Sequence, residues 1–247
     1  MKKEKGKIIL ITGSKGGCGK SFIANNIASC YAKTSNKNIL LMDLNFGRKD
    51  SRIIFKASEE NIKTVNDIGS RDVNEEILKK LIFNFDNSLN VIFPPISFND
   101  SNHFSWKANL KAASALKKYF DFIIIDTEID MNDYESCIFL SNIDKLIIVS
   151  LPDLISLTNL NLIVNLSIFY TDYINTSIVI NKFNIKPSVP FSLLNSIVKN
   201  PIDYFIPYDR DIEQLYLTKG PSEIFKYNLR IIRDINNMAK NLIEELV

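Results

Sequence analysis

Residues 7–21, KIILITGSKGGCGKS, decide the fold of this chain. Residues 7–12 form a short apolar run rich in β-branched side chains, typical of a strand that is buried on both faces. A glycine-rich loop, SKGGCGKS at residues 14–21, follows it, and a helical pattern begins at Lys20. A strand, a glycine-rich loop and a helix in this order are the context that a phosphate-binding loop requires. We therefore expect backbone N–H groups and the positive end of the helix to surround an anion.

The loop also carries the side chains that phosphate binding needs. Lys20 would neutralise charge on β- and γ-phosphates, and the hydroxyl of Ser21 would ligate Mg²⁺. The general pattern GxxxxGK[ST] has Ser14 in place of its first glycine, so the match is not strict. No GxGxxG motif can be aligned with this loop, which excludes a dinucleotide site of that kind.

Short apolar runs alternate with helical patterns along the rest of the chain. This rhythm predicts one domain, residues 1–247, of the α/β class, with a doubly wound, mostly parallel sheet and helices on both faces. The expected strands are residues 7–12, 38–43, 89–93, 122–126, 145–150, 177–180 and 203–206. The expected helices are residues 20–32, 74–83, 108–119, 157–166, 190–198 and 229–247. Residues 46–72 are the least regular, and we expect a switch-like loop with short helical turns there.

Composition excludes several classes of protein. Hydrophobic residues make up 46% of the 247 residues and charged residues 23%, which excludes a disordered or disulfide-stapled chain. A formal net charge of +2 is too small to favour a nucleic acid or a membrane as the main partner. One histidine, His103, makes a multi-histidine metal site or a Ser-His-Asp triad hard to build. No signal peptide or membrane span of about 18 apolar residues is expected, which predicts a cytoplasmic location.

The last expected helix, residues 229–247, carries an apolar stripe along one face. Its polar face mixes Arg230, Arg233 and Lys240 with acidic residues, whereas a helix that lies on a membrane surface would be more basic. We therefore expect it to dock on the core.

A second lysine in the loop, Lys15, sharpens the interpretation. The pattern KGGxGK[ST] resembles the deviant Walker A motif of the ParA/MinD family of P-loop ATPases. The resemblance implies the P-loop NTPase fold, with ATP and Mg²⁺ as cofactors. It also implies an ATP-dependent homodimer in which Lys15 reaches the nucleotide of the partner.

Other segments are similar to the same family in the same order. Residues 122–127 (FIIIDT) resemble its Walker B strand, so Asp126, together with Asp43, would hold Mg²⁺ through water beside Ser21. Asn181-Lys182 and residues 206–209 (IPYD) resemble its two base-contacting segments. The resemblance thus implies a set of nucleotide-binding residues: Lys15, Gly16, Gly17, Cys18, Gly19, Lys20, Ser21, Phe22, Asn181, Lys182, Pro207 and Asp209.

Within this family the chain is most similar to the CpaE/TadZ proteins of pilus assembly. Residues 43–47 (DLNFG), 65–68 (VNDI), 89–95 (LNVIFPP), 150–157 (SLPDLISL) and 206–209 recur there in this order. The resemblance implies a regulator of position or assembly that a protein partner recruits to a cell pole or to the inner membrane face. The receiver-like domain of that subgroup is not expected here. A DNA-partition ParA-like or MinD-like positioning ATPase is the alternative.

Two departures from the family pattern concern hydrolysis. Asn45 stands where the family has a second aspartate, and an amide cannot act as a base, so we expect slow hydrolysis with Lys15, Lys20 and Asn45 as the catalytic residues. Asp50 lies nearby and could substitute, although its position does not match the motif. Glu128 stands where the family has proline or a small residue, and its carboxylate either repels phosphates or points to solvent. A nucleotide-stabilised scaffold with little hydrolysis is therefore the hypothesis from another class.

Two further alternatives can be weighed from side chains alone. A bridging iron–sulfur cluster, as in nitrogenase-type iron proteins, would need a second cysteine near Cys137, and Cys18 and Cys30 are badly placed. DNA binding would need a basic patch, but Glu223 and Asp234 interrupt the basic residues near the end of the chain. DNA is therefore possible as a partner but not favoured.

Overall fold

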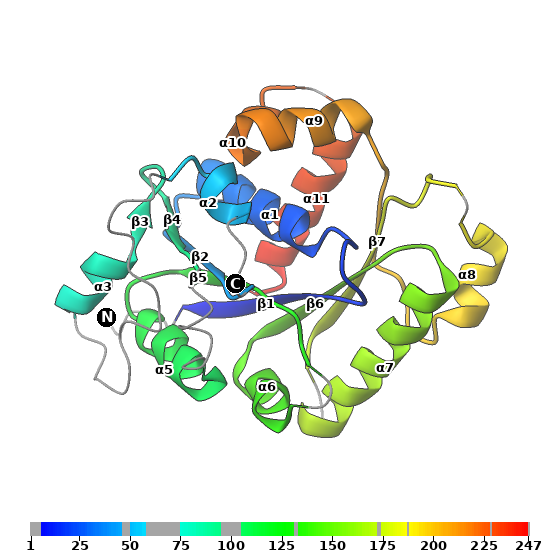
Figure 1. Ribbon diagram of the computed structural model, residues 1–247, viewed down its shortest axis with the longest axis horizontal. Coiled ribbons are helices and arrows are strands. Elements are labelled where there is room, and N and C mark those ends of the chain that lie inside the picture. Colours follow the sequence, from blue (N-terminus) through cyan, green and yellow to red (C-terminus); the bar gives the residue numbers. More distant parts are fainter. Residues whose placement is uncertain are drawn as a thin grey trace.

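An eight-stranded sheet with the order β3-β4-β2-β5-β1-β6-β7-β8 forms the centre of the molecule (Figure 1). The computed structural model describes residues 6–45, 50–57, 75–94, 105–130, 133–171, 174–186, 188–227 and 229–246. The strands are β1 (Lys7–Gly13), β2 (Ile39–Asp43), β3 (Phe83–Asn84), β4 (Leu89–Ile92), β5 (Phe122–Asp126), β6 (Lys145–Ser150), β7 (Thr176–Asn181) and β8 (Tyr204–Ile206). Every pairing is parallel except that of β3 with β4. The predicted fold class, a mostly parallel α/β sheet, is confirmed.

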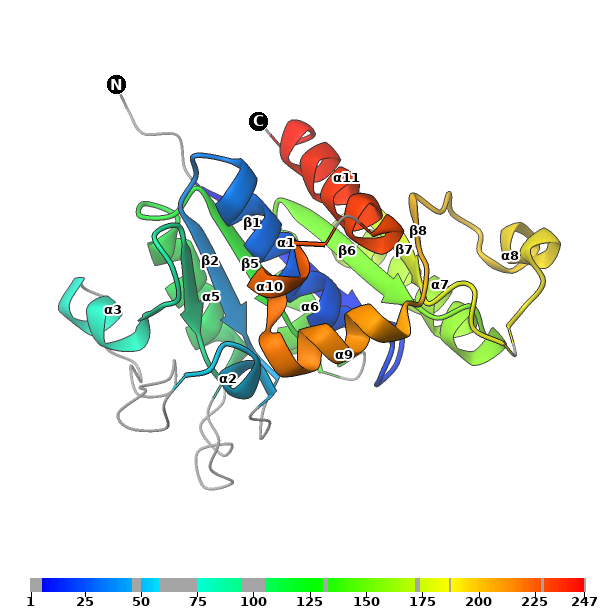
Figure 2. The ribbon, with the colours of Figure 1, turned by 90° about the horizontal axis from the view of Figure 1, so that it is seen from above.

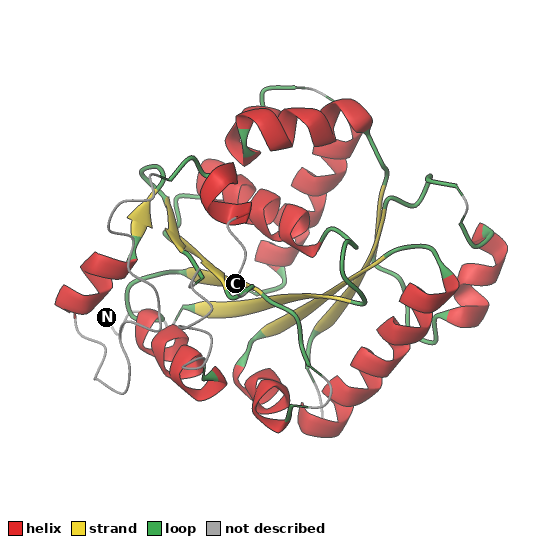
Figure 3. Ribbon diagram, viewed as in Figure 1, coloured by secondary structure: helices red, strands yellow, loops and turns green. Residues whose placement is uncertain are grey.

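Helices cover both faces of the sheet (Figures 2 and 3). The described helices are α1 (Lys20–Thr34), α2 (Asp50–Ile54), α3 (Glu75–Leu81), α5 (Trp106–Leu116), α6 (Tyr134–Phe139), α7 (Leu154–Thr171), α8 (Phe191–Ile197), α9 (Arg210–Lys219), α10 (Pro221–Ile224) and α11 (Arg230–Glu244), with a short 3₁₀ turn at Leu140–Asn142. Ile9 and Ile11 of β1 pack with α1 and α11, whereas Ile8 and Leu10 pack with α5 and α7 on the other face. This alternation explains the continuous apolar runs in the sequence.

The central strand β1 places the glycine-rich loop at the carboxyl edge of the sheet. β1 lies between β5 and β6, and the chain winds to β2 and β4 on one side and to β7 and β8 on the other. In open α/β sheets, ligands bind outside the carboxyl ends of the strands where the winding direction reverses. The fold therefore sets the loop at the expected position for a ligand.

Helix α7 differs from the expectation that no segment resembles a membrane span. Among the described helices it is the one that is long and apolar enough to cross a membrane, by length and composition only. Leu157, Leu160, Ile163 and Val164 are buried in the core beneath the sheet, and 33% of the helix is buried. Its exposed side also carries apolar residues, including Ile155, Leu162 and Phe169.

The C-terminal helix docks on the core, as predicted. Ile232, Ile235, Met238 and Leu242 of α11 are buried against α1 and the sheet. The apolar stripe is thus fully used in packing, which leaves a mixed-charge outer face.

Candidate functional site

The phosphate loop, residues 14–19, joins the end of β1 to the start of α1 and is held in place by hydrogen bonds to β6 and α7. The N–H of Ser14 donates to the carbonyl of Val149 at 2.9 Å, and its hydroxyl donates to that of Ser150 at 3.0 Å. Ser14 is buried, and the side-chain amide of Asn159 donates to its carbonyl at 3.0 Å. The serine side chain therefore adds a hydrogen bond to β6, whereas the bond to α7 is made by the backbone carbonyl, which a glycine would also offer.

Two glycines of this loop adopt conformations that other residues rarely adopt. Gly17 has φ +77° and Gly19 has φ +92°, both in the left-handed region. A Cβ atom on Gly19 would lie 2.2 Å from Nδ2 of Asn181. That amide donates to the carbonyl of Cys18 at 2.9 Å, so the end of β7 and the loop are in direct contact.

A cavity of about 340 Å³ opens above the loop. Segments that lie far apart in the sequence line it: Gly17, Gly19, Lys20, Ser21, Phe22, Asp50, Asn181, Lys182, Pro207, Tyr208, Asp209, Glu213, Tyr216, Leu217 and Ile231. Nine of these were predicted as nucleotide-binding residues from the sequence. The structure thus brings the loop and both predicted base-contacting segments to one cavity. Lys15, Gly16 and Cys18 do not line it, and burial raises the pKa of the Cys18 thiol.

Helix α9 and the residues before it form the wall of the cavity opposite the loop. Lys182 has φ +53° and donates from Nζ to Glu213 Oε1 at 2.8 Å, with its ammonium 5.1 Å from the centre of the Tyr208 ring. The hydrogen bond from Lys182 lowers the pKa of Glu213. Tyr216 packs edge-on against Phe22, with ring centres 4.9 Å apart.

Sequence reasoning missed Tyr208, Glu213, Tyr216 and Leu217 as residues of this cavity. Tyr208 lies inside the IPYD segment, and the others follow on a helix whose Asp209 accepts hydrogen bonds from the N–H groups of Asp211 and Ile212. An aspartate followed by apolar residues at positions 212 and 216 was the signal for a helix here. Its contact with α1, through Tyr216 against Phe22, is non-local, so only the structure shows it.

Two buried carboxylates face one another at the ends of β2 and β5. Asp43 and Asp126 are neighbours in the sheet, and the side-chain amide of Asn45 donates to both, at 2.7 Å and 2.8 Å. Burial raises the pKa of Asp43, and burial together with the charge of Asp43 raises the pKa of Asp126 to about 7. Oδ1 of Asp126 is buried, and no group in the described part of the chain donates a hydrogen bond to it. Such an orphaned oxygen, between a second carboxylate and the Ser21 hydroxyl, fits a hydrated Mg²⁺ ion.

A second, small cavity of about 30 Å³ lies beside Asp43 of this acidic pair. Ser21, Asp43, Asn45 and Asp50 are among the residues that line it, and Ser21, Asp50 and Tyr216 line both cavities. Asp50, the first residue of α2, therefore faces the predicted metal site despite its irregular position in the motif. Phe46, Gly47 and residues 65–68, on which part of the CpaE/TadZ resemblance depends, lie outside the described residues, as does His103.

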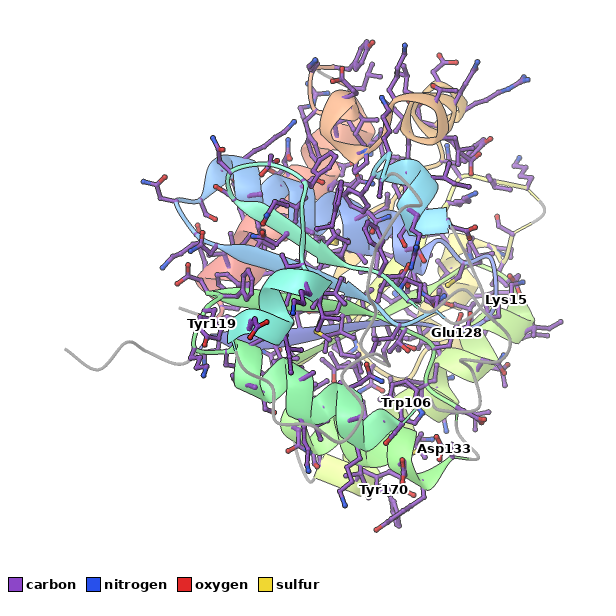
Figure 4. All side chains as sticks on the ribbon, turned by 60° about the vertical axis from the view of Figure 1, so that its left-hand side comes forward. Lys15, Trp106, Tyr119, Glu128, Asp133 and Tyr170 are labelled. Carbon is purple, nitrogen blue, oxygen red and sulfur yellow. The ribbon has the colours of Figure 1, made fainter. Side chains whose placement is uncertain are left out.

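Both lysines of the loop are paired with carboxylates of this chain. Figure 4 labels one residue of each pair, Lys15 and Glu128. Lys20 Nζ lies 3.1 Å from Glu128 Oε1, and Lys15 Nζ lies 2.7 Å from Asp153 Oδ2. Of the two alternatives weighed for Glu128, the structure shows neither in full, because the carboxylate is half-exposed and contacts Lys20. Asp153 also accepts from the N–H of Ser156 at 2.9 Å, so it caps α7.

The remaining candidates from the sequence form no metal cluster. Cys18, Cys30 and Cys137 are buried, and none of them forms a disulfide within the described residues. Within the described ranges no group of three or more His, Cys, Asp or Glu residues is placed to hold a metal ion. Trp106 packs edge-on against Phe139, with ring centres 5.6 Å apart.

Comparison with known proteins gives consistent matches along the chain. The family model AAA_31, an AAA domain, matches residues 6–180. The septum site-determining protein MinD of Thermotoga maritima is 24% identical over 250 residues, which cover 96% of this chain and 88% of the relative. The crystal structure of a ParA family ATPase from Chlorobium tepidum TLS has a TM-score of 0.80 at 22% identity, covering 95% of this chain and 98% of that one. MinD from Pyrococcus horikoshii OT3, complexed with Mg-ADP, has a TM-score of 0.76 at 18% identity, covering 96% and 95%.

Proposed function

The chain belongs to the AAA-domain family AAA_31, within the ParA/MinD class of P-loop ATPases, and we propose that it binds ATP with Mg²⁺ above the phosphate loop. One observation carries this proposal: the loop, the end of β7 and the segment before α9 line a single cavity of about 340 Å³. The loop and Lys20 hold the phosphates, and Asn181, Lys182, Pro207 and Asp209 hold the base.

The residues around the acidic pair fit the metal that the nucleotide brings. Ser21 would ligate Mg²⁺ directly, and Asp43 and Asp126 would hold it through water. When bound, the ion neutralises charge that develops on the phosphates. The amide of Asn45 meanwhile holds the two carboxylates together.

Calorimetric titration with ADP and ATP, with and without Mg²⁺, tests the proposal. We expect the Lys20→Ala variant to lose affinity, because it removes the buried ammonium at the loop. A Lys7→Ala variant serves as the matched control, since Lys7 lies at the opposite end of β1 and also pairs with a carboxylate, Asp144. Equal affinity in wild type and Lys20→Ala would contradict the proposed site.

We propose further that hydrolysis is slow. The side chain of Asn45 carries no charge and donates to both buried carboxylates, so it supplies no base. The turnover of Mg-ATP by wild type, Lys20→Ala and Asn45→Asp distinguishes a slow ATPase from a scaffold. A large gain in Asn45→Asp would favour the scaffold, and turnover in wild type well above that of Lys20→Ala would favour the ATPase.

For the cellular role we propose an ATP-dependent homodimer that times the position or assembly of a protein partner. Its motif order favours the CpaE/TadZ group of pilus assembly, in the cytoplasm, at a cell pole or inner membrane face. Partition of DNA is the alternative, and two ion pairs weaken it: Lys226 with Glu223 at 2.8 Å and Arg230 with Asp234 at 3.7 Å. Retention of the ATP-bound protein on random-sequence DNA at low salt would favour partition.

A further inference from the structure

The ammonium of Lys20 already has an anionic partner in this chain. Lys20 is largely buried, with 8% of its side chain exposed, and it donates to Glu128 Oε1 at 3.1 Å. Glu128 lies two residues after the end of β5, and 52% of its side chain is exposed. A carboxylate from the segment after β5 therefore contacts the ammonium that would otherwise bind the nucleotide phosphates.

We propose that Glu128 is an internal competitor of the nucleotide phosphates for Lys20. This inference rests on the proposed nucleotide site and adds to it a residue that sets affinity. A carboxylate and a polyphosphate repel one another at contact distance, and the repulsion is strong beside a buried group. Binding thus exchanges the ion pair of Lys20 with Glu128 for one with phosphate.

The backbone around Glu128 allows its side chain to leave without unfolding the segment. On one side the N–H of Thr127 donates to the carbonyl of Ile11 at 3.2 Å, and on the other the N–H of Ile129 donates to the hydroxyl of Thr12 at 3.3 Å. Both neighbours are thereby anchored to β1, while the half-exposed carboxylate can turn into solvent. The cost of binding is then mainly one ion pair, not a loop rearrangement.

Competition of this kind depends on which part of the ligand is present. A ligand with phosphates at Lys20, such as ADP or inorganic tripolyphosphate, must displace Glu128. Adenosine, which has no phosphate, contacts only the wall made by the end of β7 and the segment before α9. Removing the charge of Glu128 should therefore strengthen the first two ligands and leave the third unchanged.

Titration of wild type, Glu128→Gln and Glu128→Ala with these three ligands tests the inference. We expect affinity for ADP and tripolyphosphate to rise about three- to tenfold in both variants, the effect of one partly exposed ion pair. The control is Glu76→Gln, which removes the same charge from an exposed pair with Lys80 on α3 and should change nothing.

The outcomes separate this inference from the proposed function. Unchanged or weaker phosphate binding in both Glu128 variants, with normal binding in wild type, would overturn the competition and leave the nucleotide site standing. An equal gain for adenosine would also overturn it, because the effect would then not involve phosphate. If no form of the protein binds ADP or tripolyphosphate, the proposed function itself fails.

Discussion

Gly19 is the residue at which the phosphate loop is most tightly specified. Its φ of +92° is rare for any residue with a side chain, and Nδ2 of Asn181 lies where a Cβ atom would be. Gly16, three residues earlier, has open space around it and no positive φ. Both the conformation and the close contact at position 19 therefore require glycine, whereas neither requires it at position 16.

We predict that Gly19→Ala weakens both the fold and ADP binding, whereas Gly16→Ala has little effect on stability. The strained conformation and the clash with Asn181 should cost about 1–3 kcal/mol of unfolding free energy. Urea denaturation and ADP titration of both variants would measure this. Equal stability of the two variants would show that the loop relaxes around residue 19.

At the acidic pair, a pH dependence of stability follows because burial raises the pKa of both carboxyl groups, Asp43 and Asp126. The pKa of Asp126 is about 7 in the folded protein, against about 3.9 for an unfolded aspartate. When the pKa of a group is higher in the folded than in the unfolded protein, its contribution to stability is complete at a pH below the unfolded pKa. This contribution is lost as the pH rises to the folded pKa. We predict that the unfolding free energy of wild type, relative to that of Asp126→Asn, falls by about 2–4 kcal/mol between about pH 4 and pH 7. Denaturation with a chelator present would measure it, and parallel pH curves would contradict it.

Among the elements, α11 is held by more than its apolar stripe. Lys145, at the start of β6, has 1% of its side chain exposed, and it pairs with Glu245, directly after α11. Asn175 Oδ1 accepts a second hydrogen bond from the same ammonium at 2.9 Å. The end of the chain therefore neutralises a buried charge at the amino edge of the sheet.

Removing this partner should destabilise the protein without touching the nucleotide site. We predict that Glu245→Ala lowers the unfolding free energy by about 1–3 kcal/mol, because a buried ammonium loses its counter-charge. Its neighbour Glu244 is exposed and has no ion pair within the part of the chain that is described, so Glu244→Ala is the matched control. Thermal unfolding of both variants measures the difference, and similar losses would contradict the role of the pair.

Elements with a strong local pattern were predictable, and those defined by distant contacts were not. The run before the loop and the run ending at Asp126 form β1 and β5, because apolar β-branched segments between helices have few other places in a parallel sheet. By contrast Phe83 was placed at the end of a helix, yet it forms the two-residue strand β3, whose pairing with β4 is antiparallel. Helices α6 and α10 were missed because each is short, with six and four residues. Helix α9 was missed although the Asp209 cap and the apolar positions 212 and 216 are a signal for a helix.

The same division holds for the candidate site. Lys20, Ser21 and Asn181 line the predicted cavity because strand ends in a parallel sheet meet at one edge. The partners of Lys15 and Lys20 could not be predicted, because Asp153 and Glu128 are more than 100 residues away along the chain. Burial of Asp43 and Asp126 was predictable from their strands, but the bridging amide of Asn45 depends on side-chain geometry.

At the scale of the whole molecule, the ion pair of Lys15 with Asp153 must open before the proposed dimer can form its contact with the partner's nucleotide. Lys15 donates to Asp153 within its own chain, and Asp153 also caps α7. To reach the nucleotide of a partner, as the family resemblance implies, the ammonium must leave this carboxylate. The ion pair is partly exposed, so its opening costs little compared with the contact that a phosphate would offer.

We predict that Lys15→Gln still binds ATP but dimerises about tenfold or more weakly, since one charge-assisted contact across the interface is lost. Asp153→Asn should instead dimerise at lower ATP concentration, because asparagine keeps the helix cap while the ion pair is gone. Sedimentation of each variant with Mg-ATP measures both effects. Lys7→Gln is the control for charge, as Lys7 pairs with Asp144 at the far end of β1. If Lys15→Gln dimerises as strongly as wild type, Lys15 acts within its own chain, and the ion pair with Asp153 is then the contact that matters.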